Sequence, residues 1–165
     1  MFPLLFKVDA SLLSNNYHHL HAFVPQLSQF IKDRFAPNQT QGQIAELFDS
    51  YFLKMLAVEN PSPNKRFYNA LGLILKNQGV INIESDIDTG LSSRQLRRLF
   101  EFYVGDSAKT FSKVVRFQNI LRAKPSTQSL KANKLFFDVG YYDQAHFIKE
   151  FKTFYGVTPS KAFGR

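Results

Sequence analysis

The chain has 165 residues with no cysteine and no tryptophan, but with 18 phenylalanines and seven tyrosines. This composition suits one packed domain, with or without an appendage, and it excludes a disordered chain, a disulfide framework, a thiolate zinc site and a cysteine nucleophile. The net charge of +8 is uneven, since residues 1–89 carry seven basic and eight acidic side chains whereas residues 90–165 carry fourteen and five. The basic C-terminal part indicates an anionic polymer or surface as partner, with a merely solvated basic face as the alternative.

Neither a membrane span nor a leader is expected. No apolar run approaches the roughly 18 residues of a membrane span. The apolar start, residues 1–8 (MFPLLFKV), lacks the charged region and the small-residue cleavage site of a signal peptide. The absence of cysteine is compatible with a reducing cytoplasm, so we expect a cytoplasmic protein with no membrane partner.

Helical signals dominate the chain, and clean alternation of apolar and polar residues is nearly absent. Pro25–Phe35 places apolar side chains at helical spacing and stops before Pro37, and Gln43–Leu56 carries a broad apolar face. Two prolines within residues 59–64 break this pattern. We therefore predict an all-α fold, in which an N-terminal helical segment ends at a boundary near residues 57–62.

A new helix is expected directly after this boundary. Ser62 can cap it, Pro63 suits the first helical position, and the apolar spacing continues to an end near Gly79. The chain would then consist of a small helical segment, residues 1–62, and a second domain, residues 63–165.

From residue 80 onward the chain repeats itself with a constant offset of 51 residues. Ser92, with Gln95 as a capping-box partner, and Asp143 are each good helix caps, and each predicted helix ends in a glycine, Gly105 or Gly156. The apolar stripes of the two helices are Leu96, Phe100 and Tyr103 in the first copy and Phe147, Phe151 and Phe154 in the second. Two copies are too few for a solenoid, and a tandem pair of helix-turn-helix units fits better.

The faces opposite these stripes are polar and mostly basic. In the major groove, arginine can contact guanine, glutamine can contact adenine, and an apolar group can meet a thymine methyl. The stripes and Tyr155 would fix each helix to its domain, leaving the polar face free to read bases. A solvated helix face is the alternative interpretation for any single cation here.

Two stretches, Gly140–Lys152 (GYYDQAHFIKEFK) and Gly156–Ser160 (GVTPS), resemble the second helix-turn-helix signature of the AraC/XylS family of bacterial transcription regulators. The resemblance extends back over Arg116-Phe117-Gln118, which is similar to part of the family's long linking helix. It continues to residues 90–100 (GLSSRQLRRLF), which are similar to the first helix-turn-helix. In all it covers residues 63–165.

The resemblance implies two helix-turn-helix units, at about residues 80–105 and 129–156, joined by a linking helix at about residues 107–124. It also implies that recognition helices at about residues 92–103 and 143–155 read adjacent major grooves of duplex DNA. By position, the base-contacting residues would be Ser92, Arg94, Arg97, Arg98, Gln144, Ala145, Ile148 and Lys149, and the helical wheel adds His146. The expected phosphate contacts are Lys109, Lys113, Arg116, Lys124, Lys131 and Thr158.

The chain departs from the family pattern in two places and lacks one family domain. Residues 83–89, expected as the supporting helix of the first unit, are acidic and lack the family's usual alanine, and Phe136 stands where the second unit's alanine is expected. We expect no counterpart of the family's N-terminal sensor barrel, because the chain has neither the room nor the strand pattern for one. Residues 2–6 and 10–12 resemble the tail end of a sensor domain, and residues 13–56 would be the helices between sensor and DNA-binding half. We expect a fragment of a longer regulator whose effector is unknown, and RNA polymerase stays open as a further partner.

Other chemistry has little support in the sequence. His18 and His21 lie one helical turn apart but have no nearby carboxylate, so no metal site is expected. Motifs of phosphate loops, serine hydrolases and zinc proteases are absent, and we predict no catalytic residue, no cofactor and no enzyme activity. The predicted function is sequence-specific binding of double-stranded DNA for transcriptional regulation. The alternatives are a sequence-nonspecific nucleic-acid binder and a basic helical protein-interaction module.

Overall fold

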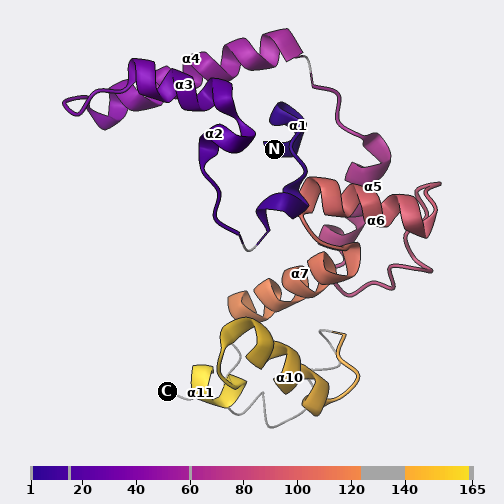
Figure 1. Cartoon of the computed structure of the whole chain (residues 1–165). Helices are drawn as coiled ribbons and strands as arrows, with labels where there is room; N and C mark the ends of the chain where they lie inside the picture. Colours follow the sequence, from indigo (N-terminus) through magenta and orange to yellow (C-terminus); the bar gives the residue numbers. More distant parts are fainter. Residues whose placement is uncertain (1, 15, 60, 124–139, 164–165) are drawn as a thin grey trace. The chain divides into compact units, whose positions relative to one another are not determined.

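The computed structural model describes residues 2–14, 16–59, 61–123 and 140–163, and in these ranges it contains helices and no strand (Figure 1). The predicted all-α class is confirmed. No described helix is both long and apolar enough to cross a membrane. The described elements are α1 (Phe2–Phe6), the 3-10 helix η1 (Ala10–Leu13), α2 (Leu20–Phe23), α3 (Pro25–Arg34), α4 (Gln41–Glu59), α5 (Lys65–Lys76), α6 (Ser93–Val104), α7 (Ala108–Ala123), α10 (Gln144–Tyr155) and α11 (Pro159–Phe163).

The chain divides into two compact units. Unit 1 comprises Met1–Phe67 and Ser92–Ser107, and unit 2 comprises Tyr68–Leu91 and Ala108–Arg165. Helix α6 therefore belongs to unit 1, whereas α7, α10 and α11 belong to unit 2. The boundary predicted near residue 62 stays a prediction.

The two predicted N-terminal helices are present as α3 and α4. Helix α4 begins where Thr40 and Gln43 bond reciprocally: the Thr40 N–H donates to Gln43 Oε1 at 2.9 Å, and the Gln43 N–H donates to Thr40 Oγ1 at 3.3 Å. This exchange satisfies backbone donors that the first turn of a helix leaves free. The helix starts two residues before the predicted Gln43 and extends to Glu59.

The predicted cap of the next helix is wrong. Helix α5 begins at Lys65, so Ser62 and Pro63 precede it. Asn64 acts as the cap, because its Oδ1 accepts a hydrogen bond from the Phe67 N–H at 3.0 Å. Asparagine caps at least as well as serine, and it stands next to the first helical residue.

The prediction of a supporting helix at residues 83–89 is also wrong, since this stretch forms turns, bends and irregular backbone. Short polar side chains hold its backbone: Asp86 Oδ2 accepts from the Asn82 N–H at 2.9 Å, and Asn82 Oδ1 accepts from the Glu84 N–H at 3.0 Å. Such local side-chain bonds compete with the helical hydrogen-bond ladder.

In unit 1, helix α6 packs against α1 and η1. Phe100 is fully buried and meets Phe67 edge-on, with 5.0 Å between the ring centroids. The helix ends at Gly105, whose φ of 94° suits glycine. A Cβ at that position would lie 3.0 Å from the Ala10 carbonyl oxygen, so the N-terminal segment approaches the helix end closely.

The core of unit 2 joins α7 to α10. Phe147 and Phe151 on α10 are fully buried, together with Phe117 and Ile120 of α7 and the nearby Tyr141. Phe117 and Phe151 meet edge-on at a centroid distance of 5.4 Å. Burying one such ring stabilises the fold by roughly 1.5–3 kcal/mol, so this cluster fixes the inner face of α10.

Candidate nucleic-acid interface

The first predicted recognition helix, α6, has the cap that the sequence predicts. Ser92 Oγ accepts from the Gln95 N–H at 3.3 Å, and Gln95 Oε1 accepts from the Ser92 N–H at 2.9 Å. Leu96 and Phe100 are buried on the inner side of this helix. The predicted contact residues on its other side are exposed: Ser92, Arg94, Arg97 and Arg98.

The three arginines of α6 differ in their engagement. Arg97 donates through Nε to Glu101 Oε1 at 2.7 Å, and this bond and charge raise the pKa of the guanidinium above its ordinary value. The pair is exposed, and such surface pairs contribute little to stability. Within the described part of the chain, Arg94 and Arg98 take part in no ion pair. These two side chains are therefore the more available donors.

The second predicted recognition helix, α10, begins after Asp143, whose Oδ1 accepts from the His146 N–H at 2.7 Å. It ends at Gly156, which has a φ of 83°. Of its predicted contact residues, four are exposed: Gln144, Ala145, His146 and Lys149. The fifth, Ile148, is only partly exposed because it packs against the core cluster of Phe147 and Phe151.

A buried carboxylate lies on the inner side of α10, a feature that the sequence analysis missed. The Glu150 side chain is 6% exposed, and its Oε1 accepts from the Tyr141 hydroxyl at 2.6 Å. Lys113 Nζ lies 3.6 Å and His146 Nε2 lies 3.9 Å from Oε2, which has no hydrogen-bond partner in the described part of the chain. One signal was available, since Glu150 follows Phe147 by three residues and so shares its buried face.

The Tyr141 hydroxyl responds to the same surroundings. Burial, the hydrogen bond to Glu150 and the charge of Glu150 raise the pKa of Tyr141 well above its ordinary value, and the nearby Arg116 opposes them. The phenol therefore stays protonated and remains a donor to the carboxylate.

Arg116, predicted to contact phosphate, is engaged inside unit 2. Its Nε and Nη2 donate to the Gly79 carbonyl at 3.3 and 3.1 Å, and its Nη1 donates to the Gly140 carbonyl at 3.1 Å. The guanidinium carbon lies 5.0 Å from the centre of the Tyr141 ring. Ser112 Oγ also donates to the Gly79 carbonyl, at 2.8 Å.

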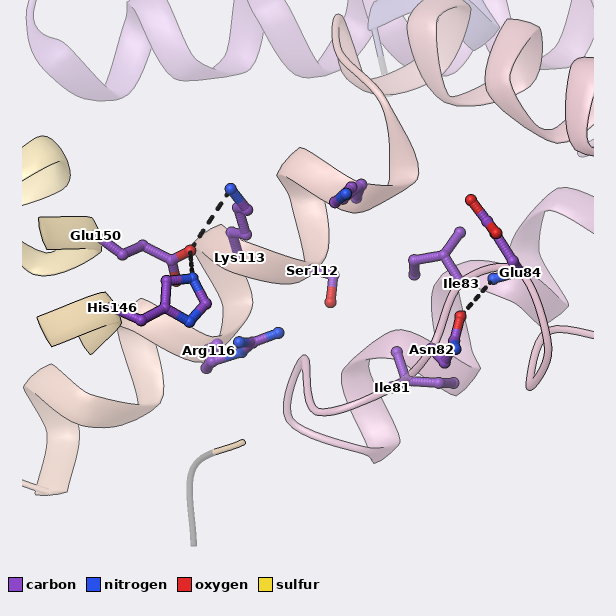
Figure 2. Close-up of a pocket in the computed structure, with 10 residues that line it drawn as sticks. Ile81, Asn82, Ile83, Glu84, Ser112, Lys113, Arg116, His146 and Glu150 are labelled. Atoms are coloured by element: carbon purple, nitrogen blue, oxygen red, sulfur yellow. Dashed lines mark hydrogen bonds and ion pairs between the residues drawn. The ribbon is translucent and has the colours of Figure 1, made fainter. Parts of the chain in front are cut away.

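These side chains border a cavity of about 420 Å³ in unit 2. Figure 2 shows Lys113 and Arg116 of α7 together with His146 and Glu150 of α10, near the loop that carries Asn82. The complete lining is Ile81, Asn82, Ile83, Glu84, Lys109, Ser112, Lys113, Arg116, His146 and Glu150.

The remaining predicted phosphate contacts have varied surroundings. Lys109 is exposed, Lys113 is half-exposed and paired with Glu150, and Thr158 is partly exposed with its Oγ1 3.2 Å from Ser160 Oγ. Lys124 and Lys131 lie outside the described residues, as does Phe136.

Metal chemistry has no counterpart where side chains are described. No group of three or more histidine, cysteine or acidic residues there could hold a metal ion. Of the two histidines considered as metal ligands, His18 and His21, the first has its Nε2 at 3.0 Å from the Leu12 carbonyl oxygen.

Known proteins resemble the C-terminal part of the chain, which contains α6 and α10. Residues 88–165 match the family described as "Helix-turn-helix domain", which is of the AraC type and is not an enzyme family. An "Uncharacterized HTH-type transcriptional regulator" of Haemophilus influenzae is 37% identical over 101 residues, which cover 59% of this chain and 33% of the relative. The chain thus spans about a third of the length of the curated relative it matches. No solved structure matches the chain significantly.

Proposed function

We propose that the chain, whose residues 88–165 match an AraC-type helix-turn-helix family, binds double-stranded DNA sequence-specifically and regulates transcription. The observation that carries the proposal is a feature common to α6 and α10. Each buries the first two residues of its predicted apolar stripe, Leu96 and Phe100 on α6 and Phe147 and Phe151 on α10, and turns cationic and amide side chains to solvent. Phe154 and Tyr155, which were also predicted to anchor α10, are 36% and 49% exposed because they lie at its last turn. The relative from Haemophilus influenzae is named a transcriptional regulator, which supports the regulatory part of the proposal.

On α6, we assign base contacts first to Arg94 and Arg98, which hold no ion pair in the described part of the chain. Arg97 must exchange its bond to Glu101 before it can reach a base. Ser92 lies at the helix start, where its N–H and hydroxyl must exchange their capping bonds with Gln95 before they can meet a phosphate or a base edge.

On α10, Gln144, Ala145 and Lys149 are the exposed residues that we assign to base contacts, with His146 beside them. Ile148 would contribute only the part of its side chain that the core leaves open. Exposed Lys109 is the clearest phosphate contact because, among the described residues, it holds no ion pair. In this assignment the two helices supply sequence specificity, and the phosphate contacts supply affinity through charge.

Binding to duplexes selected from a random pool tests the proposal. In fluorescence anisotropy titrations, Arg94→Ala or Lys149→Ala should lose preference at one position of the selected site, by roughly 1–3 kcal/mol. Lys109→Ala should weaken binding to selected and random duplexes alike, and it should reduce the log–log salt slope by about 0.9.

Lys32→Ala is the matched control, because it removes one exposed positive charge from α3. It should leave both the preference and the slope unchanged. Equal losses on every sequence for Arg94→Ala, Lys149→Ala and Lys109→Ala would identify a sequence-nonspecific binder. Absence of any duplex binding would leave the basic helical surface as a protein-interaction module.

A further inference from the structure

Arg116 joins two loops that are far apart in the sequence. It lies on α7, and its guanidinium donates both to the carbonyl of Gly79, after α5, and to the carbonyl of Gly140, three residues before the cap of α10. All three residues belong to unit 2. One side chain therefore ties the entrance of α10 to the middle of α7.

The two carbonyls belong to glycines that no other residue could replace without strain. Gly79 has a φ of 76° and Gly140 a φ of 75°. A Cβ on Gly79 would lie 2.2 Å from the Ser112 carbonyl oxygen, and a Cβ on Gly140 would lie 2.5 Å from Val80 Cγ1. The Gly79 backbone therefore lies against α7, and Gly140 lies against Val80, the residue after Gly79, so that one guanidinium can reach both loops.

The chain stays tethered from Gly140 into α10. Tyr141 follows directly, with its ring near the Arg116 guanidinium and its hydroxyl on Glu150. Two residues later Asp143 caps the helix. Because these contacts follow one another, a shift at Gly140 would carry over to the first turn, which presents Gln144 and His146.

We propose that Arg116 is a positioning residue for DNA reading: it sets the orientation of α10 on α7 and does not neutralise a phosphate. This inference rests on the proposed function and replaces the phosphate role that the sequence predicts for Arg116. The guanidinium is suited to it because it is planar and donates from separate edges. A lysine carries the same charge on a single nitrogen and cannot repeat this geometry.

Arg116→Lys separates the two roles, since it preserves the charge and removes the bridge. The measured quantity is the ratio of the dissociation constants for a random and a selected duplex. We expect this ratio to fall by about tenfold or more, as in the loss of one well-aligned base contact, while affinity for random duplex and the salt slope stay unchanged. An unchanged ratio would overturn the positioning role.

Two further variants make the test specific. Ser112→Ala removes one bond to Gly79 and leaves the Gly140 bond in place, so it should keep the ratio. If Ser112→Ala lowers the ratio of dissociation constants as much as Arg116→Lys does, the effect is due to general destabilisation and the proposal fails. Arg116→Gln serves if the lysine variant does not fold: positioning predicts an unchanged salt slope, whereas a phosphate contact predicts a slope reduced by about 0.9.

Amide hydrogen exchange without DNA gives an independent readout. Arg116→Lys should speed exchange in the first turn of α10, at the amides of His146 and Phe147, more than in α7. Equal exchange there in both proteins would overturn the positioning role whatever the DNA data. If the wild-type chain prefers no duplex at all, the proposed function and this inference fail together. If it does prefer one and the lysine variant keeps the ratio, only the positioning role fails.

Discussion

Replacing Tyr141 by phenylalanine isolates one hydroxyl in the buried network of unit 2. Phenylalanine keeps the ring that packs with Phe147 and faces Arg116. It removes the 2.6 Å hydrogen bond to Glu150, whose Oε2 already has no hydrogen-bond partner in the described part of the chain. The variant thus leaves a buried carboxylate with Lys113 at 3.6 Å as its nearest described cation.

The expected cost follows from the type of bond. A hydrogen bond to a charged group contributes roughly 1.5–3 kcal/mol, and a buried acceptor left without a donor costs a similar amount. We therefore expect Tyr141→Phe to lower the free energy of unfolding by about 2 kcal/mol in urea titrations followed by circular dichroism.

The neighbouring Tyr142 supplies the control. Its side chain is 85% exposed, so Tyr142→Phe should change the free energy of unfolding by less than about 0.5 kcal/mol. If the two variants cost equally little, the Tyr141 hydroxyl contributes nothing to stability and the account of the buried carboxylate is refuted.

Three further outcomes are expected from the same structure. Gly79→Ala should lower the free energy of unfolding by at least about 2 kcal/mol more than Gly90→Ala. Both glycines have positive φ, but only a Cβ at position 79 would meet neighbouring atoms, at 2.2 and 2.7 Å. Equal losses of the two variants in urea titrations would contradict this expectation. Ser92→Ala should cost about 1 kcal/mol by thermal unfolding, through loss of the capping box; an unchanged midpoint would argue against that cap. Since the folded-state pKa of Tyr141 is raised, its contribution is complete below the ordinary value of 10.0 and is lost as pH rises further. Stability above pH 10 should therefore fall more steeply in the wild type than in Tyr141→Phe, and parallel curves would contradict the raised pKa.

The elements that the sequence predicted well are those set by neighbours in the chain. Ser92 and Asp143 cap their helices, and Gly105 and Gly156 end them, because capping depends on residues only a few positions apart. A helix, α7 (Ala108–Ala123), is present where the linking helix is predicted, and its linking role stays a prediction.

Local competition explains what the sequence pattern missed along the chain. At residues 83–89 the family resemblance implied a helix, yet Asn82 and Asp86 bond the backbone and hold it in turns. Before α5, Asn64 rather than Ser62 supplies the capping oxygen. In both places several polar side chains could have bonded the same backbone groups, and the sequence pattern does not show which of them does so.

Long-range partners account for what was missed in the candidate site. Arg116 looked like one more cation, because its acceptors are 37 residues before it and 24 residues after it. The sequence pattern predicts no role for Glu150, because its partners Tyr141 and Lys113 come from outside its own helix. The sequence indicated which faces of α6 and α10 are polar, but not which of their neighbours are already engaged.

The central claim is that α6 and α10 read the sequence of duplex DNA, and selection of duplexes from a random pool by the whole chain tests it most directly. We predict one enriched motif with two short elements about 10–10.5 base pairs apart, the spacing of neighbouring major-groove faces. We also predict that Lys149→Ala relaxes the preference in only one of the two elements. Recovery of a pool with no enriched motif, at a salt concentration where the chain still binds duplex, would contradict the claim.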